Sequence, residues 1–500
     1  MDTRDLTARC LLSTLLLFCA HTAANDLGEG LANGAPSLLL KNASKHYTHW
    51  NGIGKMFWDE NPACTVSLLD TRDQQSKATG PAYVLTAAHC VFAVAAPTFV
   101  PAMKESVQFN YFSDTLHTSK RYAIKRTVWK DYEQTDLAIM ELDTSLSTLL
   151  EDGVTPLRLA SEWSGTTRDV LVIGAPEELP EAGLRMAACA QSQVAAGLVE
   201  GDRVYHSAVK NLCQDIRSGS SGSPVLDRAS GQILSVMASG TFGAEAEEQC
   251  FENAPCEVKD GQPQWSANTH YAHPAEYLSG CLSNSVFTDV GNACAPYRTF
   301  EVTDVKFAPT QYVSMPAHAT DPEPVLEAGF TLSTPEYRFK TVRDALQCAS
   351  PHYYSDAIDG TDAAIKTPIA REIGMHFLCI IGVQSAQQKP SVELLKSAWV
   401  IPAQLIARTP VPMPVPTVTL TSDWNYTVEW QYRVPTHFGT HYYAGPQDAT
   451  VCANVAPEAF TQTYERLTFR AEQLPLTLCS KNQDMTGRLS EVRSDPLALP

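Results

Sequence analysis

The chain alternates short apolar runs with polar turns over more than half of its length. From about Ser44 to Phe300, short β-favouring runs are separated by Gly, Asn and Asp, as at 63–69, 169–174 and 232–237. Apolar residues at the period of a long amphipathic helix are scarce. Many short strands joined by turn residues are typical of β-sandwiches and β-barrels. The pattern therefore predicts a mainly β protein.

The character of the sequence changes after Phe300, where proline becomes frequent. At 409–416 a proline occupies every second position, which fixes an extended spacer and predicts a linker. A loose internal repeat, 344–379 and 448–479, flanks this linker. Two small β-sandwich domains, immunoglobulin-like or fibronectin-like, fit its length and patterning. Each repeat would close one disulfide between cysteines near its two ends: Cys348–Cys379 and Cys452–Cys479.

These patterns divide the chain into several domains, since 500 residues exceed what one hydrophobic core normally organises. We expect a signal peptide, an N-terminal extension or propeptide, a large β domain, a first sandwich, the proline-rich linker and a second sandwich. The expected bounds, in that order, are 1–24, 25–44, 45–300, 301–408, 409–416 and 417–500.

The first residues have the features of a secretory signal peptide. Arg4 and Arg9 flank the start of an apolar stretch that runs from Cys10 to Ala20, and small residues follow, so cleavage is expected after Ala24. The apolar stretch is too short to span a bilayer about 30 Å thick. No later segment is long and apolar enough to do so. The protein is therefore expected to be secreted or periplasmic, without a transmembrane anchor.

The amino-acid composition indicates the compartment of the protein and argues against some classes of partner. Of the 14 cysteines, Cys10 and Cys19 belong to the signal, and the remaining even set suits disulfides in an oxidising compartment. No CxxC pairs indicate zinc, and we expect no metal or other cofactor. The net charge of −18 argues against nucleic acid and anionic membranes as partners, because both would repel the chain.

Three polar residues stand in a pattern that indicates nucleophilic catalysis. His89 lies in Thr-Ala-Ala-His-Cys after an apolar run, Asp136 in Thr-Asp-Leu-Ala-Ile, and Ser221 in Gly-Ser-Ser-Gly-Ser-Pro. A serine hydroxyl becomes nucleophilic when a histidine takes its proton and a third group orients that histidine. Glycines beside the serine let backbone N–H groups face the carbonyl under attack. The chain order His, Asp, Ser is one of the known arrangements of this triad.

These motifs and their β-rich setting resemble the trypsin/chymotrypsin-like family of serine peptidases over about 45–300. The resemblance implies two six-stranded antiparallel barrels with the triad in the cleft between them. Ser221 would attack the scissile carbonyl, His89 would accept its proton, and Asp136 would hold the imidazole. The N–H groups of Gly219 and Ser221 would form the oxyanion hole.

The same resemblance implies structural disulfides in this domain. Cys90 would pair with Cys64 and staple the histidine loop to the neighbouring strand, and Cys189 would pair with Cys213. Four further cysteines allow three pairings, which the sequence leaves open. They are Cys250, Cys256, Cys281 and Cys294.

The sequence departs from the family at the activation site. Ser220 precedes the expected nucleophile, where animal trypsins carry an aspartate that pairs with a newly cut N-terminus. A serine cannot form that ion pair, and no Ile-Val-Gly-Gly-type start is found near 51–54. Activation by that salt bridge is therefore not expected. The motif GxSGSP resembles secreted bacterial members instead, including glutamyl endopeptidases.

Counting back from the nucleophile gives a candidate specificity residue. Asp215 falls where trypsins place the carboxylate at the pocket base, which would select Arg or Lys before the cut. Arg217, two residues further on, is close enough to neutralise it. A glutamyl preference is less favoured, because Met237 stands where those enzymes use a histidine.

Two further segments complete the expected substrate site. The stretch Ala238, Ser239 and Gly240 resembles the strand that pairs with substrate backbone. The polar segment 241–280 is interpreted as a surface insertion, and 285–290 as the family's last barrel strand. In that alignment Ser285 would narrow the pocket.

The sequence therefore predicts a secreted serine endopeptidase that hydrolyses protein or peptide substrates through an acyl-enzyme. One alternative is a catalytically inactive, protease-like extracellular binding protein. Another is an esterase that uses the same triad, although the G-x-S-x-G setting of strand then long helix is missing. The C-terminal sandwiches are expected to bind a surface or partner, or to stabilise the protease.

Overall fold

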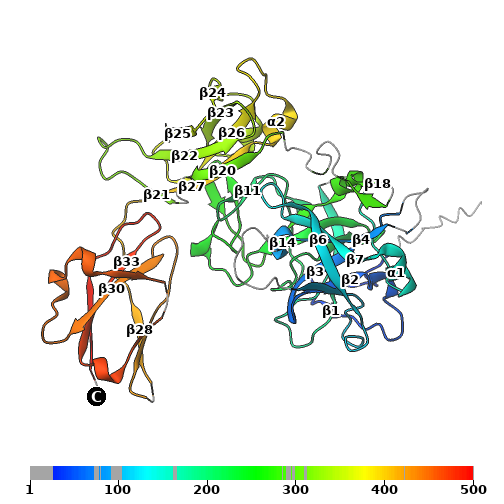
Figure 1. Cartoon of the computed structure of the whole chain (residues 1–500), viewed down its shortest axis with the longest axis horizontal. Helices are drawn as coiled ribbons and strands as arrows, with labels where there is room; N and C mark the ends of the chain where they lie inside the picture. Colours follow the sequence, from blue (N-terminus) through cyan, green and yellow to red (C-terminus); the bar gives the residue numbers. More distant parts are fainter. Residues whose placement is uncertain are drawn as a thin grey trace, which may run out of the picture.

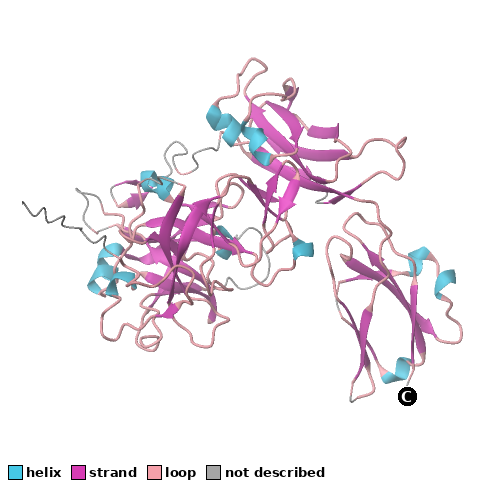
Figure 2. Cartoon of the chain, turned by 180° about the vertical axis from the view of Figure 1, so that it is seen from behind, coloured by secondary structure: helices cyan, strands magenta, loops and turns pink. Residues whose placement is uncertain are grey.

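A computed structural model provides the structure of the chain (Figure 1). It describes residues 26–72, 78, 80–91, 104–161, 166–283, 285–288, 294, 299–308, 312–421, 423–464 and 466–498. The expected signal peptide lies outside these residues. Strands dominate the described residues, and the α-helices α1 (Leu146–Glu151) and α2 (Val392–Lys396) are short (Figure 2).

Six antiparallel strands close the first barrel, in the order β2-β3-β4-β7-β6-β5. Their apolar side chains fill its interior, where Met56, Val66, Val84 and Met140 are fully buried. The strands are β2 (Ile53–Trp58), β3 (Asn61–Leu68), β4 (Pro81–Thr86), β5 (Glu105–Gln108), β6 (Arg121–Asp131) and β7 (Leu137–Ser145).

A second barrel follows, in the order β9-β12-β17-β14-β13-β8, and it closes because β8 pairs with β9. Its strands are β8 (Thr167–Gly174), β9 (Arg185–Gln193), β12 (Val209–Asn211), β13 (Pro224–Asp227), β14 (Ile233–Gly240) and β17 (His270–Pro274). The two six-stranded barrels confirm the predicted fold of this domain.

The segment expected as an extension or propeptide is packed onto the second barrel. Within it, β1 (Leu38–Leu39) pairs with β9, and Leu40 is fully buried in the core. The Arg228 guanidinium forms an ion pair with Asp26, with an Nε–Oδ1 distance of 2.6 Å. The residues from 26 onward are thus part of the domain's packing.

The structure corrects the position of the last barrel strand. The described part of 285–290 contains β19 (Val286–Phe287), which pairs with β18 (Leu282–Ser283) in a separate two-stranded sheet. The barrel is completed instead by β17 (His270–Pro274), inside the segment that was interpreted as a surface insertion. Four successive β17 residues, His270 to His273, are buried. A strand buried on both faces lacks the alternation by which strands are recognised.

A four-stranded sheet outside the barrels joins the protease-like domain to the first sandwich. Its strands, in the order β11-β10-β15-β16, are β10 (Gly197–Glu200), β11 (Arg203–Tyr205), β15 (Cys256–Lys259) and β16 (Gln262–Gln264). Val199, Val204 and Val258 share one hydrophobic cluster with residues of the first sandwich, among them Ala345 and Phe377. Figure 1 shows β11 beside β27 (Trp399–Ile406) of that sandwich. The core is therefore continuous across this boundary.

The first sandwich consists of a three-stranded sheet packed against a five-stranded sheet. Phe330 of the smaller sheet and Ile380 of the larger sheet both lie in the core. The smaller sheet contains β20 (Val302–Phe307), β22 (Val325–Leu332) and β25 (Ala363–Pro368). The larger contains β21 (Tyr312–Ser314), β27 (Trp399–Ile406), β26 (Gly374–Val383), β23 (Glu336–Val342) and β24 (Ile358–Asp359).

The second sandwich has three strands in one sheet and four in the other, with Val428 and Leu478 in the core between them. The first sheet contains β28 (Pro416–Leu420), β29 (Tyr426–Trp430) and β32 (Leu467–Phe469). The second contains β31 (Thr461–Thr463), β30 (Gly439–Pro446), β33 (Leu476–Gln483) and β34 (Arg493–Leu497). This domain stands apart from the other two in Figures 1 and 2.

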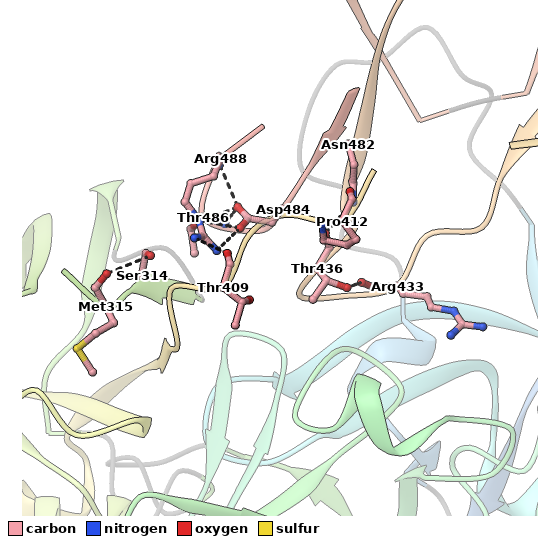
Figure 3. Close-up of polar contacts among 10 residues, drawn as sticks. All are labelled: Ser314, Met315, Thr409, Pro412, Arg433, Thr436, Asn482, Asp484, Thr486 and Arg488. Atoms are coloured by element: carbon pink, nitrogen blue, oxygen red, sulfur yellow. Dashed lines mark hydrogen bonds and ion pairs between the residues drawn. The ribbon is translucent and has the colours of Figure 1, made fainter. Parts of the chain in front are cut away.

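Side chains of the second sandwich hold the proline-rich linker (Figure 3). Arg488 donates to the carbonyl of Thr409 over 2.9 Å, and the buried amide of Asn482 donates to the carbonyl of Pro412 over 3.1 Å. Arg488 is itself held by Asp484, with an Nη2–Oδ2 distance of 2.7 Å. The linker is thus fixed to the domain that follows it.

Six disulfides link the described cysteines. They are Cys64–Cys90, Cys189–Cys213, Cys250–Cys256, Cys281–Cys294, Cys348–Cys379 and Cys452–Cys479. The third and fourth resolve the pairing that the sequence left open. None of the helices in the described ranges combines the length and apolar character needed to cross a bilayer.

Candidate active site

The expected histidine and aspartate meet at the edge of the first barrel. His89 lies in the 3-10 turn η2 (Ala88–Cys90) just after β4, and Asp136 directly precedes β7, the strand that pairs with β4. One carboxylate oxygen of Asp136 is 2.6 Å from His89 Nδ1, and the other accepts from the His89 backbone N–H over 2.8 Å. Two bonds from one carboxylate fix both the ring and its backbone.

The two groups stabilise each other's charged forms. Burial lowers the pKa of His89, but the hydrogen bond and charge of Asp136 outweigh burial and the net pKa is raised. Burial raises the pKa of Asp136, and the bond and charge of His89 outweigh it, so this pKa is lowered. The carboxyl group is therefore ionised near neutral pH, which fits a group that orients an imidazole.

Ser221 stands in a turn that only glycines can form on either side. Gly219 and Gly222 have φ angles of +84° and +82°, and a Cβ on Gly222 would lie 2.1 Å from the carbonyl oxygen of Thr65. The Ser221 hydroxyl donates to the carbonyl of Ala238 over 3.4 Å. His89, Asp136 and Ser221 all line one cavity of about 750 Å³, so the structure brings the three predicted residues to one site.

The backbone of this turn offers two donors to the cavity. Within the described residues, the N–H groups of Gly219 and Ser221 have no hydrogen-bond partner. The neighbouring amides are occupied, since Ser220 donates to the carbonyl of Arg217 and Gly222 to that of Met237. Two unpaired N–H groups, one of the serine itself and one two residues before it, have the composition of an oxyanion hole.

A buried lysine, which the sequence analysis did not identify, is hydrogen-bonded to this turn. The side chain of Lys55 in β2 is 1% exposed, and its ammonium donates to the carbonyls of Ala63 (2.6 Å), Ala175 (2.8 Å) and Gly219 (3.4 Å). Glu177 pairs with the same ammonium over 2.9 Å. Burial lowers the pKa of Lys55, while Glu177 acts in the opposite direction.

The predicted substrate-binding residues do not all reach the cavity. Ala238, Ser239 and Gly240 line it, but Asp215 does not. The Asp215 residue has a φ of +62°, and its carboxylate accepts from the backbone N–H (2.9 Å) and hydroxyl (2.7 Å) of Ser37. The carboxylate of Asp215 is thus bonded to the N-terminal segment and does not lie at the cavity wall, where a pocket base was expected. Ser285 is likewise absent from the cavity wall, because β17 and not 285–290 passes beside Gly240.

The sheet that joins the domains supplies part of the cavity wall. Glu200 of β10 and Arg203 of β11 line it together with Tyr132, and the Arg203 guanidinium lies 4.3 Å from the centre of the Tyr132 ring. Burial raises the pKa of Glu200, although Ser239 and Arg203 act in the opposite direction. No sequence motif marks Glu200 or Arg203, because their sheet is an addition to the barrels.

Comparison with known proteins agrees with this geometry. The family model described as a trypsin-like peptidase domain matches residues 74–236, a span that contains His89, Asp136 and Ser221. The comparison with curated proteins found no match.

Several solved structures are similar to about half of this chain. A mutant of Rv3671c from M. tuberculosis H37Rv, in an inactive form, is 16% identical, covers 49% of this chain and 91% of its own, and has a TM-score of 0.29. A Glu endopeptidase in complex with MPD is 17% identical, covers 49% and 92%, and has a TM-score of 0.31. The thermostable serine protease AL20 is 16% identical, covers 45% and 92%, and has a TM-score of 0.29.

The double-barrel fold and the family model agree on the class of this domain. The chain carries a trypsin-like peptidase domain, followed by two β-sandwich domains.

Proposed function

We propose that the protein is a serine endopeptidase in which Ser221, His89 and Asp136 form the catalytic triad. The observation that carries the proposal is the His89–Asp136 contact of 2.6 Å, which opens on the same cavity as Ser221 and two unpaired backbone N–H groups. Acyl transfer needs a nucleophile, an oriented base and donors for the oxyanion, and these groups supply each of them.

The reaction follows from these roles. The Ser221 oxygen adds to the scissile carbonyl carbon while His89 Nε2 takes the hydroxyl proton, and the carbonyl oxygen becomes an oxyanion that the N–H groups of Gly219 and Ser221 bind. The protonated imidazole gives its proton to the leaving amine, and an ester to Ser221 remains. A water molecule, deprotonated by His89, then cleaves the ester and regenerates the hydroxyl.

Labelling with a fluorophosphonate tests the proposal directly. The secreted full-length protein should react at Ser221, and Ser221→Ala should abolish both labelling and cleavage of a peptide library. An unlabelled and inactive wild-type protein would contradict the proposal and favour the inactive binding protein. Labelling together with hydrolysis of simple esters, but of no peptide in the library, would favour the esterase.

A preference for Arg or Lys would need Asp215 to meet the substrate side chain. Its carboxylate is bonded to Ser37 and does not line the cavity, so we do not include that preference in the proposal. The test is Asp215→Ser, which should leave the residue preferred before the cut unchanged.

We also propose that the protein is secreted or periplasmic. Six disulfides distributed over all three domains support an oxidising compartment. Signal cleavage after Ala24 is tested by sequencing the N-terminus of the secreted protein. Binding of a surface or partner by the sandwiches stays a prediction.

A further inference from the structure

The wall of the cavity carries charges of both signs. Residues 238–240, which should pair with substrate, line it together with the charged side chains of Glu178, Glu200, Glu248, Glu252, Arg203 and Arg217. The side chain of Glu200 is hydrogen-bonded to Ser239 and lies within the electrostatic reach of Arg203, Asp136 and His89.

Beside the nucleophile turn, the wall contains Arg217, four residues before Ser221, and His270 of β17, whose pKa the charge of Arg217 helps to lower. His270 is 3% exposed, and its Nδ1 lies 2.7 Å from where a Cβ on Gly240 would stand. The imidazole therefore packs directly against Gly240, the last residue of the segment that should pair with substrate. Burial lowers the pKa of His270 to about 4, so the fixed charge here is that of Arg217.

The guanidinium of Arg217 is held in place but is not neutralised. It stacks 3.4 Å from the centre of the Phe242 ring, and its Nη1 donates to the carbonyl of Ile216 over 2.9 Å. In the described part of the chain, no carboxylate lies within ion-pair distance of it. The charge of Arg217 helps to lower the pKa of Asp215, but the Asp215 carboxylate is hydrogen-bonded to Ser37.

The geometry of a bound substrate would place one of its side chains beside Arg217 and His270. When the scissile carbonyl oxygen lies at the N–H groups of Gly219 and Ser221 and the preceding backbone pairs with 238–240, the side chain just before the cut lies between the 216–220 turn and that strand. Arg217 and His270 both line this space. A carboxylate would there meet a stacked, unpaired guanidinium, whereas a lysine or arginine would be repelled.

We propose that the enzyme cleaves after acidic residues, Asp or Glu, and that Arg217 binds their carboxylate while His270 closes the end of the pocket. This inference rests on the proposed endopeptidase function and names its substrate class. It differs from the sequence-based expectations, which placed Asp215 at the pocket base and disfavoured a glutamyl preference because Met237 stands in place of a histidine. In the structure, Asp215 does not line the cavity, whereas Arg217 and His270 do.

Three peptides that differ only in the residue before the cut test the inference on the full-length protein. Glu, Gln and Lys at that position compare a carboxylate with its neutral isostere and with a cation. We expect kcat/KM for Glu to exceed that for Gln by about 10- to 100-fold, the range that a charge-assisted hydrogen bond supplies, and Lys to be poorest. Arg217→Gln should bring the Glu-to-Gln ratio close to one.

Arg121→Gln is the matched control, because Arg121 pairs with Glu60 and does not line the cavity. It should keep the Glu-to-Gln ratio of the wild type. Preference for Lys, or a ratio that Arg217→Gln does not change, would overturn the inference while fluorophosphonate labelling of Ser221 still supported the endopeptidase. Loss of labelling and of all cleavage in the wild type would overturn both.

Discussion

At the scale of single residues, Lys55 has the most unusual environment near the site. A buried ammonium is costly unless it is paired and fully hydrogen-bonded, and here three carbonyls and one carboxylate surround it. One of those carbonyls belongs to Gly219, whose N–H has no hydrogen-bond partner in the described part of the chain. We interpret Lys55 as a positioning residue that fixes the carbonyl of Gly219 and with it the turn before Ser221.

Lys55→Met tests this role. The methionine keeps the volume and removes the donor, so the turn loses one of its fixed points and kcat should fall roughly 10-fold, less than the loss of an oxyanion donor itself, while KM changes little. Steady-state kinetics at a temperature well below the melting point measure both. Lys120→Met, at an exposed lysine paired with Asp152, should leave kcat unchanged; a fall in stability alone, with kcat intact, would contradict the positioning role.

The His89–Asp136 pair predicts a pH effect with a definite sign. The base must be neutral, so activity is lost as the pH falls through the pKa of His89, which Asp136 raises. Asp136→Asn removes that charge, so the acid limb of kcat/KM should move to lower pH while kcat falls by roughly 10⁴-fold. A pH–rate profile measures the shift, and an acid limb that stays in place would show that Asp136 does not set this pKa.

At the scale of elements, the added sheet is fitted closely to the first sandwich. Gly197 at the start of β10 is buried, and a Cβ there would lie 2.7 Å from the Cβ of Ala345. The two domains meet at this point without room for a methyl group. β10 and β11 also carry Glu200 and Arg203 of the cavity wall. Packing at this boundary therefore helps to position two side chains of the candidate active site.

Gly197→Ala should destabilise the protein by about 1–3 kcal/mol through overpacking. Thermal unfolding measures the loss. The matched control is Gly280→Ala, where a Cβ would meet no atom within 4 Å, and this change should stay within about 0.5 kcal/mol of the wild type. Equal stability of the two variants would show that the contact between the two domains accommodates the added methyl group without loss of stability.

The elements also show how far the sequence could predict the structure. Strand and turn patterning predicted only a mainly β protein. The two barrels, and the common cavity of His89, Asp136 and Ser221, were expected because the motifs around these residues resemble a known family. β17 was missed because its residues, two histidines among them, are buried on both faces and do not alternate. Lys55 was not recognised, because the carbonyls that surround it come from segments far apart in sequence. For the same reason the partner of Asp215 could not be foreseen.

At the scale of the whole molecule, the three domains are joined in two different ways. The peptidase domain and the first sandwich share one hydrophobic cluster, in which Val199, Val204 and Val258 are covered by the sandwich. The second sandwich instead holds its own linker, through Arg488 and Asn482 (Figure 3). The peptidase domain and the first sandwich should therefore fold together, whereas the second sandwich should fold independently of both.

Two truncations test this division. A chain that ends after Arg408 loses the linker and second sandwich, and it should keep the melting temperature and fluorophosphonate labelling of the peptidase domain. A chain that ends near Phe300 exposes the three valines, each worth about 1.5–3 kcal/mol when buried, against a typical total stability of about 5–15 kcal/mol. It should melt far lower or aggregate, as calorimetry and light scattering would show. If the shorter chain were instead as stable and as readily labelled as the longer one, the first sandwich would be an accessory and not part of the enzyme's core.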